Sequence, residues 1–288
     1  MDLDRDGRRD ILSGSYSRME NDMAGLFQIL RGQPDGTFRK AEVLNGTDGQ
    51  PLIIPLNGGR FTENICTRPF AVDWDGDGLL DLVVGTFAGS FYLFHGQGDG
   101  KFAPKPDEIK VGDQPLKIDG YHGDPFVVDW DGDGDLDILS GSAEGGVQWV
   151  ENRAGAGKPP ALTSFRPLVP PGPKHEYGQI LRDADLHGPV GNTRVWADDV
   201  NGDGKLDLLV GDSAPLISPA DGLSEAEFKE RFAAWTKLRT EASGKVQAAA
   251  NDEKEQAKAQ QHLQDLYGQR SQFMKEDSTG FVWLYIRK

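Results

Sequence analysis

The chain has 288 residues, of which 37% are hydrophobic and 27% are charged. This balance is too apolar for a disordered chain and too polar for a membrane protein, and no run of about 18 apolar residues is present. The net charge of −15 disfavours nucleic acid and anionic lipid as partners. Cys66 is the only cysteine, which excludes disulfides within the chain and cysteine-based zinc sites. We therefore predict a globular protein without nucleic-acid binding or membrane insertion.

The first residues already belong to a structural motif. Met1 is followed at once by the acidic segment 2–7, without the basic, apolar and small-residue order of a signal peptide. We therefore expect the sequence to be the C-terminal part of a longer protein. The other end, residues 280–288, has the pattern of a complete strand.

One acidic pattern occurs four times, with starts 71, 56 and 70 residues apart. It reads Asp-x-Asp/Asn-x-Asp-Gly-x-x-Asp, followed by three apolar or small residues and a glycine. The acidic and amide positions are Asp2, Asp4, Asp6 and Asp10; Asp73, Asp75, Asp77 and Asp81; Asp129, Asp131, Asp133 and Asp137; and Asp199, Asn201, Asp203 and Asp207.

Each acidic loop predicts a bound cation. Two carboxylates about 4 Å apart repel by about 4 kcal/mol at an effective dielectric of about 20, so a positive ion is needed between them. Only oxygen ligands are offered, which favours calcium. Positions 1, 3, 5 and 9 supply side chains, and the glycine at position 6 permits a sharp turn. The backbone carbonyls at position 7 complete the predicted ligands of up to four calcium ions: Arg8, Leu79, Asp135 and Lys205.

Loops of this composition have two other interpretations. An EF-hand requires Glu at position 12 between two helices, whereas the last three copies carry Val84, Ser140 and Val210 there, between β-type sequences. The EF-hand is therefore rejected. A surface turn rich in Asp and Asn without a metal remains the alternative.

The four loops resemble the FG-GAP or VCBS repeats of β-propeller proteins, including the calcium loops of integrin α-subunits. The resemblance covers residues 1–213 and 280–288 and implies propeller blades with calcium held in a turn between strands. Asn201, the missing first strand of the first copy and the small number of blades depart from the family pattern. We therefore expect a mainly β fold with four recognisable blades of a larger propeller.

A second strand is predicted after each loop, over residues 25–30, 89–94, 146–150 and 280–285. In the fourth copy, residues 214–279 intervene as a predicted helical hairpin. Ser224 and Glu227 form a capping box, apolar residues follow at helical spacing, and Ser243-Gly244 is expected to end the first helix. The predicted domains are thus blades over 1–213 and 280–288, with a helical insertion over 214–279.

No recognised catalytic motif is present. The sequence lacks a nucleophile elbow, a phosphate-binding loop and a His-Glu-x-x-His motif. Candidate catalytic residues are limited to His122 and Tyr121, just before the third loop. Their convergence with Arg68 or Arg194 in one cleft would indicate an enzyme.

Two functions follow from these patterns. The first is a calcium-stabilised binding or adhesion module for a protein or carbohydrate ligand. It would act outside the cytoplasm, where calcium reaches about 10⁻⁴–10⁻³ M, and would need a signal on a missing N-terminal part. The alternative is a calcium-dependent carbohydrate-active enzyme of the polysaccharide lyase type, which the resemblance to calcium propellers also allows.

Overall fold

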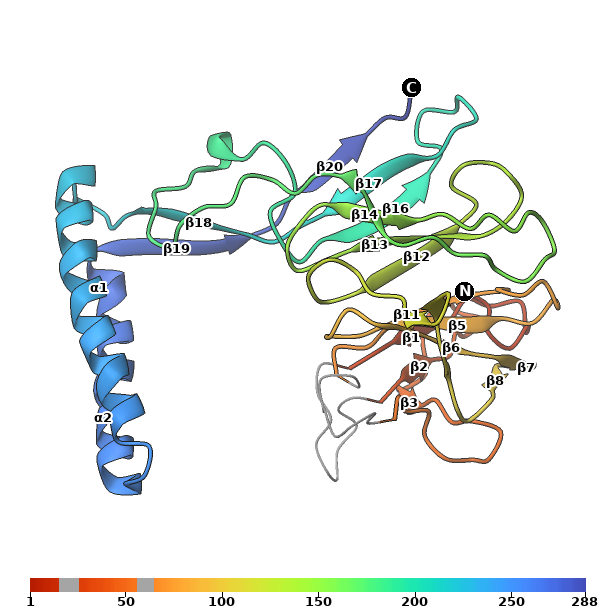
Figure 1. The fold of residues 1–288 in the computed structure, drawn as a ribbon, viewed down its shortest axis with the longest axis horizontal. Coiled ribbons are helices and arrows are strands. Elements are labelled where there is room, and N and C mark those ends of the chain that lie inside the picture. The colour runs from red at the N-terminus through yellow and green to blue at the C-terminus, as the bar shows by residue number, and fades with distance from the viewer. Residues whose placement is uncertain (16–25, 56–64) are drawn as a thin grey trace. The chain divides into compact units, whose positions relative to one another are not determined.

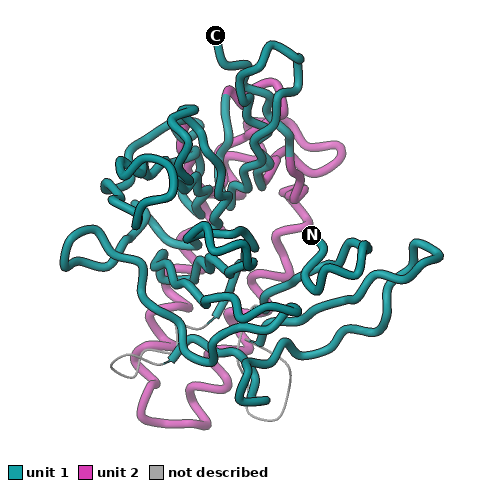
Figure 2. The backbone as a smooth tube through the Cα atoms, turned by 90° about the vertical axis from the view of Figure 1, so that its right-hand side faces the viewer, with its two compact units in different colours: residues 1–172, 188–213, 281–288 teal, residues 173–187, 214–280 magenta. Residues whose placement is uncertain are grey.

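The computed structural model describes residues 1–15, 26–55 and 65–288. The chain is mainly β and forms two compact units (Figures 1 and 2). Unit 1 comprises residues 1–172, 188–213 and 281–288, and unit 2 comprises residues 173–187 and 214–280. Within the described residues, neither helix has the length and apolar character needed to cross a membrane.

Unit 1 contains one antiparallel sheet for each acidic repeat. The first sheet consists of β1 (Ile11–Ser13), β2 (Gln28–Leu30) and β3 (Glu42–Val43). The second consists of β4 (Arg68–Val72), β5 (Asp81–Gly85), β6 (Phe91–Phe94) and β9 (Asp107–Glu108). The third consists of β12 (Asp124–Val128), β13 (Asp137–Gly141), β14 (Val147–Val150) and β15 (Arg166–Val169). The fourth consists of β16 (Arg194–Asp198), β17 (Asp207–Gly211) and β20 (Val282–Tyr285).

Two short ribbons complete unit 1. They are β7 (Gly96–Gly98) with β8 (Lys101–Phe102), and β10 (Lys110–Val111) with β11 (Gln114–Pro115). The predicted second strands are observed as β2, β6, β14 and β20, although Gly25 lies outside the described residues. β15 was not predicted, because the proline-rich sequence around it favours a loop.

Neighbouring repeat sheets bury their faces against each other. Side chains alternate across a strand, so successive residues of β5 point to opposite faces. Leu82 and Val84 belong to a core shared with the first sheet, whereas Val83 belongs to a core shared with the third. A further core joins the third sheet to the fourth. Burial on both faces explains why β5 and β13 are continuously apolar or small after their first Asp.

The glycine that ends each repeat motif lies where the next sheet approaches. A Cβ atom on Gly14, Gly85 or Gly141 would overlap a backbone carbonyl of the following sheet. The carbonyls belong to Thr67, Gly123 and Thr193. The motif therefore requires glycine because sheet-to-sheet packing leaves no space for a side chain.

Unit 2 consists of a long hairpin inserted between β17 and β20, together with residues 173–187. β18 (Ala214–Pro219) pairs with β19 (Met274–Thr279), and α1 (Glu225–Ala248) packs on α2 (Glu253–Gly268). Short 3₁₀ helices lie at Asp183–Asp185 and Gln269–Gln272. The Ser224–Glu227 capping box is present. Trp235 is buried, and its Nε1 donates to the Leu266 carbonyl at 2.8 Å.

The predicted helix end at Ser243-Gly244 is wrong. α1 continues through both residues to Ala248. A glycine in a helix interior costs about 1 kcal/mol, which is less than the packing gained when Ala242 and its neighbours cover α2.

Candidate metal centres

The four acidic loops share one hydrogen-bond pattern. In every copy the carboxylate at position 1 accepts from the backbone N–H of the position-6 glycine, at 2.9 to 3.0 Å. The position-5 carboxylate accepts from the N–H of position 7, at 2.7 to 3.1 Å. These local bonds fold each loop into a turn with its carboxylates gathered on one side.

The loops use a left-handed backbone at two positions. The position-6 glycines Gly7, Gly78, Gly134 and Gly204 have φ between 84° and 94°. Position 4 has positive φ as well, and there the first copy carries Arg5 at 59° where the other copies carry glycine. A β-carbon is disfavoured at positive φ, so the turn geometry explains why glycine recurs at positions 4 and 6.

Three loops bring carboxylate oxygens together. In each of the first three copies, one ligand oxygen from each of three acids lies within 4.8 Å of the others. The triplets are Asp2, Asp4 and Asp6; Asp73, Asp75 and Asp81; and Asp129, Asp131 and Asp133. In the fourth copy, Asn201 replaces the middle acid and its amide donates to Asp203 at 3.1 Å. The fourth loop therefore has a weaker cation-binding set.

Several oxygens in these loops lack a partner. Asp4 Oδ1, Asp73 Oδ1 and Asp135 Oδ1 are shielded from solvent and accept no hydrogen bond. Leaving a buried acceptor unsatisfied costs about 1–3 kcal/mol, and more when the group is charged. A cation would satisfy these oxygens, so the residues present fit a hard metal ion.

The acid at position 9 has a structural role in every copy. Asp10, Asp81, Asp137 and Asp207 are at most 5% exposed. One oxygen of each accepts from the backbone N–H of position 2, at 3.0 to 3.2 Å. The other accepts from the backbone N–H two positions after the end of β2, β6, β14 or β20, at 2.6 to 3.0 Å. Each acid thus fastens the loop to its sheet, and its additional role as a metal ligand stays a prediction.

Burial changes the acidity of these loops in the absence of a metal. It raises the pKa of Asp137 to about 6, an effect that nearby Asp131 and Asp135 reinforce. Burial also raises the pKa of Asp81 and of Asp131, and neighbouring acids add to both shifts. The raised pKa values show that these carboxylates carry their charge at a cost that a cation would remove.

One residue beside the second loop was not foreseen. His95 Nδ1 lies 3.8 Å from Asp75 Oδ2, and His95 Nε2 lies 3.1 Å from Asp107. His95 follows β6, 20 residues from Asp75 in sequence. No local pattern could have paired the two, because only the strand pairing of β5 and β6 brings them together.

His122 lies near Arg68 and Arg194, the two arginines that were expected to converge with it. Its ring lies 4.9 Å from the Tyr121 ring and 4.6 Å from the Phe87 ring. Burial lowers the pKa of His122, and the positive charges of Arg68 and Arg194 lower it further. Both ring nitrogens are shielded from solvent without a hydrogen bond of standard geometry. The structure therefore brings His122 together with Tyr121, which is exposed, and with both arginines, while the ring nitrogens of His122 are shielded from solvent.

Asp124 links the two arginines at the starts of the first strands of their sheets. Its carboxylate lies 3.6 Å from Arg68 Nε and 3.2 Å from Arg194 Nε. Burial raises the pKa of Asp124, and the two guanidinium groups oppose the shift. This ion-pair cluster joins the second, third and fourth sheets, so it has a structural role in holding them together.

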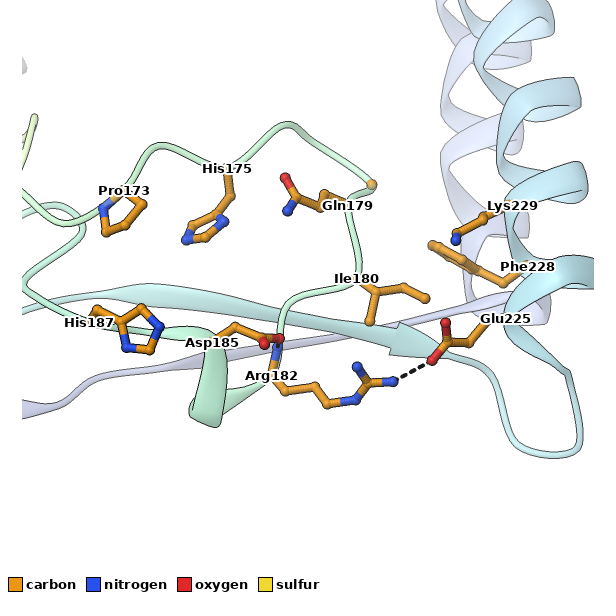
Figure 3. Close-up of a pocket in the computed structure, with 11 residues that line it drawn as sticks. Pro173, His175, Gln179, Ile180, Arg182, Asp185, His187, Glu225, Phe228 and Lys229 are labelled. Atoms are coloured by element: carbon orange, nitrogen blue, oxygen red, sulfur yellow. Dashed lines mark hydrogen bonds and ion pairs between the residues drawn. The ribbon is translucent and has the colours of Figure 1, made fainter.

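Unit 2 contains a separate polar pocket of about 560 Å³. Figure 3 shows His175 and His187 pointing into this space from one side, while Phe228 and Lys229 reach it from α1. Arg182 and Glu225 form an ion pair across one end at 2.5 Å. His175 and His187 both line this pocket, within unit 2.

The sheets and loops together define a tandem-repeat β protein with acidic turns suited to cations. The family model of the FG-GAP-like repeat matches residues 73–140, which run from the second acidic loop through the third and into β13. Residues 73–140 are therefore similar to the FG-GAP-like repeat, as the acidic motifs had indicated. No curated protein matches the sequence.

Proposed function

We propose that this chain is a calcium-stabilised binding module whose FG-GAP-like repeats are blades of a β-propeller. The unpartnered carboxylate oxygens of the first three loops are the observation that carries this proposal. Calcium tolerates irregular sets of six to eight oxygen ligands, whereas magnesium requires near-octahedral geometry and retains more water. A loop that offers three carboxylates and a backbone carbonyl suits calcium better.

Calcium would act by linking ion binding to folding. The second, third and fourth loops each connect two paired strands of one sheet, as β4 and β5 flank the second loop. An ion that neutralises the crowded carboxylates therefore stabilises the turn and the strand pairing together. Loops on a rigid repeat scaffold then present a surface for a protein or carbohydrate ligand, outside the cytoplasm where calcium is abundant.

The test is thermal unfolding with calcium, with magnesium and with EDTA. At a calcium concentration 100 times Kd, one site adds about 2.7 kcal/mol, which corresponds to a Tm rise of about 5–10 °C. Asp73→Asn should reduce this rise because it removes a charged ligand candidate in the second loop. Asp113→Asn, in an exposed turn outside the loops, is the matched control and should preserve it. An identical Tm in calcium and EDTA would refute the calcium role.

The second candidate function is a polysaccharide lyase, favoured by the convergence of His122 with Tyr121, Arg68 and Arg194. A neutral imidazole can accept a proton from the carbon beside a uronate carboxylate, and the C–O bond at the neighbouring carbon then breaks to leave a double bond. The oxygen of the departing sugar keeps the bonding electrons and takes a proton from water. The binding module is preferred because both ring nitrogens of His122 are shielded from solvent. Incubation with acidic polysaccharides, comparing the chain with His122→Ala, decides between them: unsaturated products only with the unaltered chain support the lyase.

A further inference from the structure

The side chain at position 7 distinguishes the third acidic loop from the other three. That position is Asp135 in the third loop, and Arg8, Leu79 and Lys205 in the others. The backbone carbonyl of position 7 is a predicted ligand in every copy, whereas a side-chain carboxylate is present there only in the third. The third loop therefore has more acidic side chains within its turn than any other copy.

Asp135 is buried and fixed in place. Its side chain is 6% exposed, and its Oδ2 accepts from the Gly155 backbone N–H at 2.6 Å. The segment that contains Gly155 also approaches the loop at Ala156, because a Cβ on Gly134 would lie 3.2 Å from the Ala156 Cβ. The second loop has no such cover, since a Cβ on Gly78 would meet nothing within 4 Å. The third loop is therefore the more rigid of the two.

The other oxygen of Asp135 lacks a partner. Oδ1 is shielded from solvent and accepts no hydrogen bond. The Asp135 N–H donates to Asp133 at 3.1 Å, and Asp133 belongs to the carboxylate triplet with Asp129 and Asp131. Burial raises the pKa of Asp135, the Gly155 N–H opposes this shift, and the Asp133 and Asp131 carboxylates add to it. A cation bound beside these carboxylates would stabilise the charge of Asp135 and satisfy its free oxygen.

The first and second loops are partly neutralised by the chain itself. In the first, Arg31 Nη1 lies 3.2 Å from Asp4 and 3.3 Å from Asp10. In the second, the His95 imidazole lies 3.8 Å from Asp75. Within the part of the chain that the structure describes, no Lys, Arg or His forms an ion pair with an acid of the third loop. The carboxylates of the third loop are therefore the least compensated.

We infer that the third loop is the tightest of the four cation sites, and that the Asp135 side chain is the residue responsible. The affinity of calcium loops depends on the number of charged ligands and on the rigidity of the site, and the third loop is favoured on both counts. This inference rests on the proposed calcium binding. It adds which loop is filled first when calcium is limiting, and which side chain decides the order.

The first test is calorimetric titration of the metal-free full chain with calcium chloride. Asp135→Asn removes the charge but keeps the shape of the side chain and an acceptor for the Gly155 N–H. It should weaken the tightest binding phase by about tenfold. Asp77→Asn, the matched control, removes an acid of the second loop and should leave the tightest phase unchanged. A tightest phase that survives Asp135→Asn unaltered overturns the inference, as does its loss in Asp77→Asn.

Thermal unfolding separates a metal ligand from a residue with only a structural role. In EDTA, Asp135→Asn should keep or raise the Tm, because it removes a buried charge that lies beside other acids. In calcium, the rise in Tm should be smaller for this variant than for the unaltered chain. A structural role alone would lower the Tm equally in both conditions. A calcium-induced rise of undiminished size would therefore contradict the inference.

A terbium titration leaves every carboxylate unaltered. Trp74 and Trp130 occupy position 2 of the second and third loops, so terbium bound in either loop is excited mainly through that loop's own tryptophan. At one equivalent of terbium, Trp130→Phe should lose most of the sensitised emission and Trp74→Phe should retain it. Equal emission from the two variants, or the reverse order, overturns the inference. Absence of any calcium or terbium binding refutes the proposed function itself, whereas binding in another order refutes only the role of the third loop.

Discussion

The third and fourth repeat sheets have the same motif but different surroundings. Both place a buried Asp at the start of the strand that follows the loop, β13 or β17, where it accepts two backbone hydrogen bonds. Only the third is covered on both faces, and only the third gathers three carboxylates in its loop. The comparison shows that the motif specifies the turn and strand of one repeat, whereas the neighbouring sheet determines how much each apolar residue contributes to stability.

The largest expected difference is in the stability lost when one apolar residue is shortened at matching positions of the two sheets, Leu139 of β13 and Leu209 of β17. Leu139→Ala should lower the free energy of unfolding by about 2–5 kcal/mol, because Leu139 is fully buried between two sheets. Leu209→Ala, at the same position of the fourth sheet, should cost less than about 1.5 kcal/mol because Leu209 is only half-buried and solvent can fill part of the space. Urea unfolding of both variants measures this, and equal losses would contradict the comparison.

The motif glycines give the next difference. Gly141→Ala should destabilise by about 1–3 kcal/mol, because its Cβ would overlap the Thr193 carbonyl. Gly211→Ala, with open space around it, should change stability by no more than about 0.5 kcal/mol. Thermal unfolding at matched calcium compares the two. A costly Gly211→Ala would show that this face of the fourth sheet is covered in solution.

The pH dependence of the calcium-free protein gives a smaller effect. The folded pKa of Asp137, about 6, is above its ordinary value of 3.8, so the folded state binds more protons than the unfolded state between these values. Stability should therefore fall by about 1–3 kcal/mol as pH rises from about 4 to about 6. Unfolding in EDTA across this range should show the decline, and Asp137→Asn should flatten it. Saturating calcium should also flatten it if the ion lies near this carboxylate.

The acidic turns were predictable because all of their determinants lie within nine residues. The glycine spacing, the carboxylate positions and the following strand are local, and the structure follows the same hydrogen-bond pattern in each copy. The contact between His122 and Tyr121, the candidate residues of the enzyme alternative, was predictable for the same reason, since the two are adjacent in sequence. The β-propeller arrangement stays a prediction, because no core among the described residues joins the fourth sheet to the first.

Features that depend on distant contacts were missed. Asp124 was not foreseen as the carboxylate between Arg68 and Arg194, because these residues come from three separate repeats. The exposure of the fourth sheet could not be read from its sequence, since Leu209 and Leu139 have the same local pattern. Likewise, Ser243-Gly244 favours a helix end locally, and only packing against α2 keeps α1 intact.

The insertion of unit 2 also affects how the fourth sheet forms. Asp137 is bonded to Asn152, 15 residues away, whereas Asp207 is bonded to Arg287, 80 residues away. Closing the longer loop costs about 1.5 kcal/mol more in chain entropy, since each doubling of length costs about 0.6 kcal/mol. The last strand should therefore join its sheet late in folding, after the hairpin of α1 and α2 has shortened the path between the ends.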